Sequence, residues 1–268
     1  MPELPEVETV KNGLTKLLGE DAQIERIEVV NQNLRFPVPA DISDIGQGKI
    51  IKRMNRRAKY LLFDLEDIIL CSHLGMTGTW RLLSEKKKHD HIHIYLKDKR
   101  VLTFNDPRRF GFFEYFKKDE SYHRFLHLGP EPLSHKFDFD YLWPMTRNKE
   151  VAIKNFIMNQ EVVVGVGNIY AAESLFDSKI KPQRKSKTIK KEELKLLIKN
   201  IKKTLKRAIH AGGSTISDFK QAGGESGYFQ HEFKVYDRKG EPCLNCQRLL
   251  KNVVLGGRAS VYCPYCQK

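Results

Sequence analysis

The residues whose types and spacing best suit catalysis lie at the start of the chain, in Met1-Pro2-Glu3-Leu4-Pro5-Glu6. Once Met1 is removed, the nitrogen of Pro2 is a secondary α-amine, and an α-amine titrates near neutral pH. Part of it is then an uncharged nucleophile, which can attack an aldehyde-like carbon and form an imine, as catalytic lysines do. Glu3 and Glu6 could act beside it as acid and base. The alternative is an ordinary chain start in which these acids cap a helix.

A helix is expected to position these residues. Pro5 suits the first turn of a helix, where its missing N–H costs nothing. Apolar residues then recur at helical spacing as far as Leu18, and Gly19 is a stop signal. Pro2 would therefore lie at a helix N-terminus. The positive end of the helix dipole disfavours a protonated amine there and attracts phosphate.

The charge balance narrows the class of partner. The chain has 268 residues, with 47 Lys and Arg against 33 Asp and Glu, a net charge of +14. This surplus favours a polyanion such as DNA, RNA or an anionic membrane surface. The length allows a sizeable core and two or three structural units. No apolar run approaches the roughly 18 residues of a membrane span, and no secretory signal is visible, so a cytoplasmic protein is expected.

Cysteines near the end of the chain predict a metal site. They form two C-x-x-C pairs separated by sixteen residues, made of Cys243, Cys246, Cys263 and Cys266. Four thiolates at this spacing can close a tetrahedral zinc site, which would be structural because it leaves no open position for a substrate. Redox-active dithiols are the alternative. Arg258 follows two glycines between the pairs, where a hairpin turn would present it to a DNA groove.

The pattern of secondary structure changes near residues 129–132. Before them, a series of short strands with intervening turns predicts a β-rich domain, either a sandwich or a barrel. After them the apolar period becomes helical, most clearly from Leu194 to Ile209. Residues 181–211 contain twelve Lys or Arg and two Glu, which we interpret mainly as a solvated helix face. Residues 212–229 are rich in Gly, Ser and aromatics and predict a long functional loop.

Two turns carry groups that could enter a DNA duplex. Arg108 and Phe110 lie on a turn that follows a strand, and Met76 lies on another. Proteins that bend DNA insert an apolar wedge and a cation between base pairs. For Phe110 and Met76, an ordinary position in the core is the alternative.

Other motifs offer phosphate contacts. Asn168 follows two glycines and opens a helix, where backbone N–H groups bind phosphate well, although a plain helix–helix turn would look the same. Lys59 lies in Arg56-Arg57-Ala58-Lys59-Tyr60, a basic turn before a strand, which taken alone indicates a solvated charge cluster. His89 and His91 flank an aspartate, which suits a phosphate contact or a polar strand end better than a metal site.

Taken in order, seven motifs resemble one family across nearly the whole chain, the bacterial formamidopyrimidine-DNA glycosylases, also called 8-oxoguanine DNA glycosylases. The motifs are Pro2-Glu3-Leu4-Pro5-Glu6-Val7-Glu8, Arg56-Arg57-Ala58-Lys59-Tyr60-Leu61, His73-Leu74-Gly75-Met76, Asp106-Pro107-Arg108-Arg109-Phe110-Gly111, Leu128-Gly129-Pro130-Glu131-Pro132, Val163-Val164-Gly165-Val166-Gly167-Asn168-Ile169-Tyr170, and the cysteine pairs with Gly257-Arg258.

The resemblance implies an α+β multidomain protein. Residues 1–130 would form the catalytic domain, an N-terminal helix followed by a β-sandwich. Residues 131–229 would form a helical helix–two-turn–helix domain and include a loop, 214–229, that closes over the damaged base. Residues 230–268 would form a zinc finger in which the four cysteines bind one structural zinc ion.

The resemblance also implies a base-excision-repair enzyme that is both a glycosylase and an AP lyase. Its partner would be double-stranded DNA containing oxidised purines, with no membrane involved, and it would act as a monomer in the bacterial cytoplasm, on the nucleoid. The Pro2 nitrogen would attack C1′ of the damaged nucleotide, with Glu3 as the acid that helps open the sugar and Glu6 assisting by position. Lys59 matches the residue assigned to β-elimination and Arg258 the one assigned to δ-elimination.

The DNA contacts that the resemblance implies form two groups. The gap left by a flipped-out nucleotide must be filled, and Met76, Arg108 and Phe110 match the residues that fill it. The positions that match the family's contacts to DNA are His89, Arg108, Lys149 and Asn168. Lys154 is a further candidate for such a contact.

Two other functions remain open from the sequence. One is an endonuclease VIII-type glycosylase for oxidised pyrimidines, which shares the Pro-Glu start and the lyase chemistry; Leu4, Val7 and Glu8 with the long loop favour the purine branch. The other is a non-catalytic zinc-ribbon homologue that binds DNA, against which the intact Pro2, Glu3 and Lys59 argue.

The charge surplus predicts a strong salt dependence of DNA binding. Phosphate contacts release counterions, so the logarithm of the binding constant should fall with the logarithm of salt concentration by roughly 0.9 per phosphate contacted. Fluorescence anisotropy with a labelled duplex, titrated from low to physiological salt, measures this slope. A flat response would contradict a phosphate-based interface.

Overall fold

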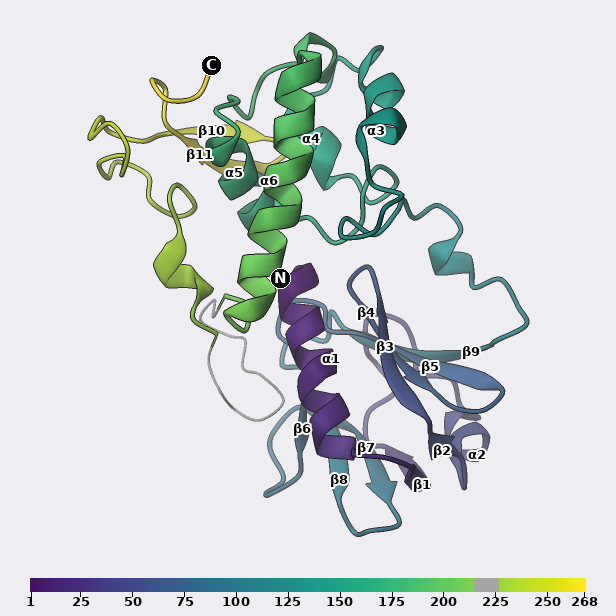
Figure 1. Ribbon diagram of the computed structural model, residues 1–268. Coiled ribbons are helices and arrows are strands. Elements are labelled where there is room, and N and C mark those ends of the chain that lie inside the picture. The colour runs from purple at the N-terminus through teal and green to yellow at the C-terminus, as the bar shows by residue number, and fades with distance from the viewer. Residues whose placement is uncertain (215–226) are drawn as a thin grey trace. The chain divides into compact units, whose positions relative to one another are not determined.

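The computed structural model describes residues 1–214 and 227–268, which divide into two compact units (Figure 1). Unit 1 comprises Met1–Leu126 and Ala211–Tyr228, and unit 2 comprises His127–His210 and Phe229–Lys268. The domain boundaries expected near residues 130 and 229 stay a prediction. Within the described ranges, no helix combines the length and the apolar character needed to cross a lipid bilayer.

Unit 1 starts with a helix and continues mainly as strands. Its elements are α1 (Leu4–Leu18), β1 (Ala22–Val29), α2 (Ile42–Gly46), β2 (Ile50–Ile51), β3 (Arg53–Arg57), β4 (Tyr60–Asp64), β5 (Ile68–His73), β6 (Thr79–Leu82), β7 (Asp90–Leu96), β8 (Val101–Asn105), β9 (Phe112–Lys117) and the 3-10 turn η1 (His123–Phe125).

The strands of unit 1 pair antiparallel in two orders, β2-β1-β7-β8-β6 and β3-β4-β5-β9. Apolar side chains from both sheets and from α1 form one buried cluster. Trp80 in β6 lies fully buried there and packs on Phe63, Phe104 and Phe113. Its indole N–H donates to the hydroxyl of Ser72 in β5 at 3.0 Å, which joins the two sheets inside the core. The expected helix and β-sandwich are confirmed.

The helix α1 is as the sequence predicts. Val7, Val10, Leu14 and Leu18 are buried at helical spacing, and α1 packs along β3 and β4. It ends at Gly19, whose φ of 68° suits a residue without a Cβ. The helix begins one residue earlier than expected, at Leu4.

Strand β3 was not expected, because its Arg-rich sequence is typical of a polar turn. Arg56 and Arg57 are its last residues and pair with Leu61 and Tyr60 across a hairpin. The turn itself is therefore shorter than predicted and consists of Ala58 and Lys59. A polar segment can form this strand because it lies at the edge of its sheet, where charged side chains can reach solvent or a partner.

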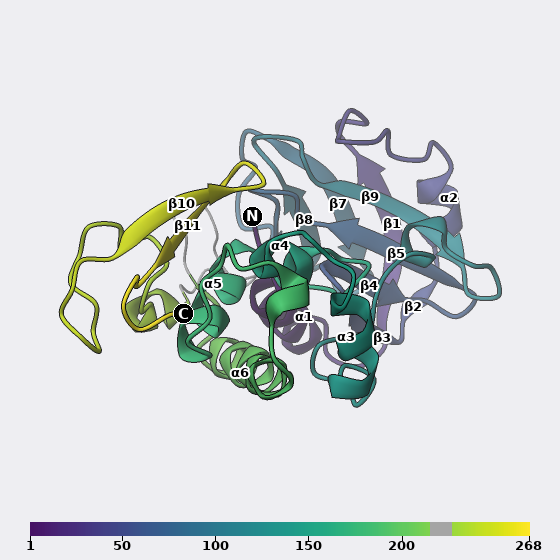
Figure 2. The same ribbon diagram turned by 90° about the horizontal axis from the view of Figure 1, so that it is seen from above.

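Unit 2 is mainly helical and ends in a β-hairpin. Its elements are α3 (Phe139–Thr146), α4 (Ile153–Met158), α5 (Asn168–Asp177), the 3-10 turn η2 (Ser186–Thr188), α6 (Lys191–His210), the 3-10 turn η3 (Phe229–Glu232), β10 (Lys251–Leu255) and β11 (Arg258–Tyr262). Helix α5 packs against α4, α6 and β11, and Figure 2 shows β10 and β11 side by side as the hairpin. The expected helix–two-turn–helix fold and zinc finger are confirmed.

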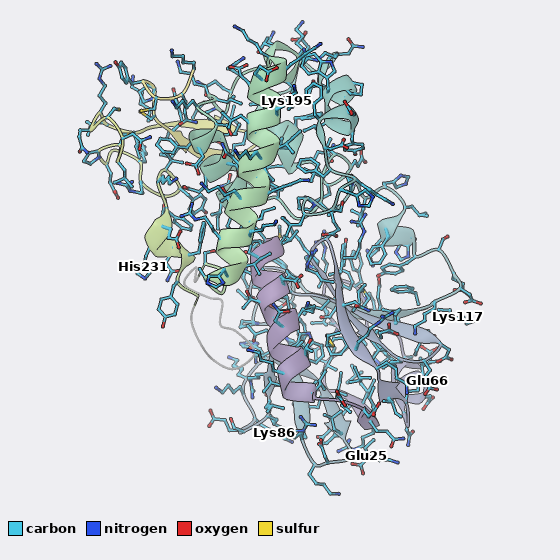
Figure 3. All side chains as sticks on the ribbon, in the orientation of Figure 1. Glu25, Glu66, Lys86, Lys117, Lys195 and His231 are labelled. Carbon is cyan, nitrogen blue, oxygen red and sulfur yellow. The ribbon has the colours of Figure 1, made fainter. Side chains whose placement is uncertain are left out.

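Helix α6 shows the expected amphipathic pattern. Leu194, Leu197 and Leu205 are among its buried residues, whereas Lys195 and Lys199 are exposed; Lys195 is labelled near the start of the helix in Figure 3. The prediction of a solvated basic face therefore fits this helix.

Candidate active site and nucleic-acid interface

The start of α1 is held by reciprocal hydrogen bonds. Pro2, Glu3 and Glu6 are buried, and Glu3 and Glu6 form a capping box. The Glu6 carboxylate accepts the backbone N–H of Glu3 at 2.9 Å. It also accepts the N–H and the hydroxyl of Ser214 at 2.8 and 2.9 Å. The helix-capping alternative is thus part of the structure, and it fixes the backbone directly beside Pro2.

The turn that carries Lys59 is tied to α1. Arg56 donates from Nε to the Glu8 carboxylate at 2.6 Å and from Nη1 to the carbonyl of Ala58 at 2.8 Å. Burial alone would raise the pKa of Glu8, but hydrogen bonds from Lys11 and Arg56 and their positive charges outweigh it, so the pKa is lowered and the carboxylate stays ionised. Lys59, only 8% exposed, therefore sits in a turn held to the helix that begins beside Pro2.

His73 at the end of β5 is neutral at ordinary pH. Its ring stacks on Phe112 and contacts Tyr60, and its Nδ1 accepts the N–H of Gly75 at 3.0 Å. Burial and then the nearby positive charge of Lys59 lower the pKa of His73 to about 4. The hydrogen bond from Gly75 requires the same neutral ring, because it uses the Nδ1 lone pair.

Met76, Arg108 and Phe110 lie at the surface of unit 1. Met76 is 37% exposed and Phe110 is 44% exposed, so the alternative that both belong to the core is wrong. The guanidinium of Arg108 lies 4.8 Å from the centre of the Phe110 ring, a cation–π contact. An apolar side chain held outward beside a cation is what insertion into a base stack requires.

His89, just before β7, has a φ of 74° and is half-buried.

In unit 2, Lys154 organises the residues around the start of α5. It is 1% exposed and donates to Oδ1 of Asn168 at 2.6 Å, to the hydroxyl of Ser260 at 2.7 Å and to the carbonyl of Ala259 at 3.2 Å. An ammonium group can only donate, so it fixes the amide oxygen of Asn168 inward. The amide nitrogen, a donor, is then directed away from Lys154 at the helix N-terminus, where an anion is favoured.

The hairpin β10–β11 presents Arg258 as the sequence predicts. Gly256 and Gly257 form its two-residue turn with φ of 55° and 73°, and Leu255 pairs with Arg258. Positive φ at both positions is the pattern of a type I′ turn, which suits a tight hairpin. Arg258 is exposed, as is Lys149 after α3.

The cysteine cluster fits a zinc ion. The sulfur atoms of Cys243, Cys246, Cys263 and Cys266 all lie within 4.8 Å of one another, with Cys246 and Cys263 at 3.5 Å and Cys243 and Cys266 at 3.9 Å. Tetrahedral Zn–S bonds of about 2.3 Å place sulfurs about 3.8 Å apart, whereas a disulfide needs about 2.05 Å.

Two contacts within the units were not predicted from the sequence. Glu173 on α5 is buried and accepts the backbone N–H groups of Lys234, Val235 and Tyr236. Burial raises the pKa of Glu173, although these hydrogen bonds oppose the shift. The carboxylate attaches α5 to the segment before the zinc finger. The pairing of Glu8 with Arg56 was also missed, and complementary charges in two short motifs were its one available signal.

The predicted site residues divide between the units. Unit 1 carries Pro2, Glu3, Glu6, Lys59, Met76, His89, Arg108 and Phe110. Unit 2 carries Lys149, Lys154, Asn168, Arg258 and the four cysteines. Of the expected closing loop, residues 215–226 lie outside the described residues.

Comparison with known families and relatives supports the same assignment. Family models match residues 1–113 as the formamidopyrimidine-DNA glycosylase N-terminal domain, residues 128–220 as its H2TH domain, and residues 240–268 as the zinc finger found in FPG and IleRS. Proteins named formamidopyrimidine-DNA glycosylase from Legionella pneumophila (strain Lens) and Bdellovibrio bacteriovorus are 47% and 46% identical. Both alignments cover 100% of this chain, and they cover 98% and 100% of the relatives.

Solved structures show the same fold. The Lactococcus lactis Fpg in complex with DNA containing an abasic site has a TM-score of 0.91 at 34% identity, covering 99% of each chain. The Fpg protein of Thermus thermophilus has a TM-score of 0.90 at 36% identity, covering 99% of this chain and 98% of that one. The family match of the zinc finger and the close approach of the four sulfur atoms together identify the four cysteines as the ligands of one structural zinc ion.

Zinc removal should loosen the finger selectively. The metal supplies much of the stability of so small a module, so chelation is expected to speed amide exchange in residues 243–266 and to weaken DNA binding. Hydrogen–deuterium exchange with mass spectrometry measures this, and the sheets of unit 1 are the internal control. Unchanged exchange in the finger after verified zinc loss would contradict a structural role.

The neutral state of His73 should make stability depend on pH. The folded pKa of about 4 lies below the ordinary 6.5, so the unfolded chain binds the proton first as pH falls. The free energy of unfolding should therefore drop by about 1–2 kcal/mol from this residue between pH 7 and pH 5. Urea unfolding of wild type and His73→Asn measures it, because the Asn oxygen can still accept from Gly75. Equal pH dependence in both proteins would contradict the assignment.

Proposed function

The chain belongs to the formamidopyrimidine-DNA glycosylase family, and from this we propose how its residues act. The protein is a base-excision-repair glycosylase that binds DNA and acts on damaged purines. We propose that its substrates are oxidised purines, 8-oxoguanine and formamidopyrimidines, in double-stranded DNA. We further propose that it acts as a monomer on the nucleoid, that it is also an AP lyase, and that its domains span residues 1–130, 131–229 and 230–268.

The proposed first step uses the Pro2 nitrogen as nucleophile. Removal of Met1, which is 47% exposed, turns that nitrogen from an amide into an amine. The nitrogen attacks C1′ and forms a C–N bond while the glycosidic bond breaks and the electron pair of that bond leaves with the base, which takes up the proton lost by the Pro2 nitrogen. A proton from Glu3 to the ring oxygen then opens the sugar and gives a Schiff base.

The proposed elimination steps cut the strand on both sides of the lost sugar. The Schiff base acidifies the proton on C2′, and its removal expels the 3′ phosphate. Lys59 is the proposed residue for this β-elimination, and its place beside α1 supports the proposal. A second elimination expels the 5′ phosphate, and Arg258 at the hairpin tip is the proposed residue for it.

The proposed DNA contacts follow from base flipping. A base inside a duplex cannot reach the Pro2 nitrogen, so it must leave the stack, and its gap must be filled. Met76, Arg108 and Phe110 are proposed to fill it, as their exposure supports, and the loop 214–229 is proposed to close over the flipped base. The proposed contacts to the phosphates, with Lys154 acting through the Asn168 amide, are His89, Lys149, Lys154 and Asn168.

The observation that carries the catalytic assignment is the set of hydrogen bonds made by Glu6. Its two carboxylate oxygens accept from the backbone of Glu3 and from Ser214. These bonds support a positioning role for Glu6 and leave the acid role to Glu3. They also hold the backbone of Glu3, which is bonded directly to Pro2, the residue proposed to bear the nucleophile.

Borohydride trapping tests the proposal. Protein with a free Pro2, verified by mass spectrometry, is incubated with a duplex carrying 8-oxoguanine opposite cytosine and then reduced. A covalent protein–DNA adduct that maps to Pro2 is expected. Glu3→Gln should lower the single-turnover rate by about 10²–10⁴-fold, because proton transfer is lost at nearly constant shape; Glu20→Gln, an exposed site, is the matched control.

The same experiment separates the other functions. Pro2→Gly should reduce adduct and strand cleavage while DNA binding stays nearly unchanged. An adduct formed solely on a duplex with an oxidised pyrimidine would move the substrate to that class. If neither duplex gives an adduct, the imine mechanism is wrong for this protein.

A further inference from the structure

Asp106 is a buried carboxylate where the two proposed gap-filling loops meet. Its exposed fraction is 0%. Oδ1 accepts the hydroxyl of Thr77, next to Met76, at 2.5 Å, and Oδ2 accepts the N–H of Gly111, next to Phe110, at 2.8 Å. One side chain therefore holds both loops.

The backbone of Asp106 reaches a third segment. Its N–H donates to the carbonyl of His89 at 3.1 Å, and its carbonyl accepts Nε2–H of His91 at 2.8 Å. The same carbonyl accepts the N–H of Arg109, which has a left-handed φ of 55°. A non-glycine residue holds that conformation where the surrounding structure imposes it.

Thr77 links the loops a second time. Its hydroxyl donates to Asp106 and accepts the backbone N–H of Arg108 at 3.3 Å. The loops also touch directly at Gly75, which has a φ of 62° and where a Cβ would lie 2.4 Å from the nitrogen of Gly111. Met76 and the Arg108–Phe110 pair thus project from loops that interlock.

We propose that Asp106 is a positioning residue that makes these loops one preorganised wedge. The inference rests on the proposed gap-filling role of Met76, Arg108 and Phe110. Loops ordered during folding lose little conformational freedom on insertion, whereas flexible loops would lose it at that step. Because binding to undamaged duplex depends mainly on phosphates, Asp106 acts on the insertion step rather than on affinity.

Thr77→Val is the decisive variant. It keeps the side-chain shape but removes the donor to Asp106 and the acceptor for Arg108. Single-turnover excision from an 8-oxoguanine duplex should slow by about three- to tenfold, the range expected for a lost hydrogen bond. The rise of 2-aminopurine fluorescence, with the probe beside the lesion, should slow equally, while the Kd for undamaged duplex stays within about twofold.

Matched variants make the result specific. Thr77→Ser keeps the hydroxyl and should restore the rates. Asp106→Asn should slow insertion further, because its amide can offer only one acceptor oxygen to Thr77 and Gly111. Circular dichroism and Tm identify any variant that fails to fold, and Thr77→Val and Thr77→Ser carry the test independently of Asp106→Asn.

Phe110→Ala separates failure of this inference from failure of the proposed function. If Phe110→Ala slows insertion and Thr77→Val does not, Asp106 has no positioning role although the wedge is real. If Phe110→Ala changes nothing, the gap-filling role itself is wrong. A weaker Kd for Thr77→Val at an unchanged insertion rate would overturn the inference too, since it would indicate a general loss of surface structure.

Discussion

The start of unit 1 depends on how one carboxylate, Glu6, is bound. The first residues of a chain usually fray unless they are tied down, and the nucleophile proposed at Pro2 would have to be held to within about 0.5 Å. Glu6 meets this constraint because it is buried and accepts from the backbone of Glu3 and from Ser214. Loss of either partner would leave a buried acceptor unsatisfied, which is costly. The hydrogen bonds from Arg56 to Glu8 and to the carbonyl of Ala58 then connect α1 to the turn that carries Lys59.

In unit 2 a buried cation, Lys154, holds its neighbours as the buried carboxylate of Glu6 does in unit 1. Lys154 is a buried cation, and burial of a charge is tolerated where polar groups compensate it. Its hydrogen bonds to Asn168 and to Ala259 and Ser260 connect the start of α5 to the hairpin β10–β11 through one buried amine. The finger itself buries few apolar residues, Val235, Leu250 and Val261 among them, so the metal must supply what the small core does not.

The sequence predicted the parts whose signals are local. Helix α1, the glycine turn before Arg258 and the cysteine pairs depend on neighbours a few residues apart. Contacts between distant residues were not predicted, such as Glu8 with Arg56, 48 positions away, because each partner alone is an ordinary surface residue. The same holds for Asp106, whose type gives no hint that Thr77 and Gly111 converge on it. The exposure of Met76 and Phe110 could not be predicted from residue type alone, because hydrophobic residues are most often buried in the core.

The positive charge of the chain is better explained by binding than by stability. Many of the described ion pairs join two exposed side chains, and such pairs contribute about 0–1 kcal/mol each. Lys199 and Lys203 on α6 are exposed with no carboxylate partner among the described residues, and like charges at this spacing destabilise a helix by about 0.2–0.5 kcal/mol. The apolar face of α6 offsets this small cost. A net charge of +14 raises the rate of encounter with a phosphate backbone, so the surplus of positive charge favours association with DNA.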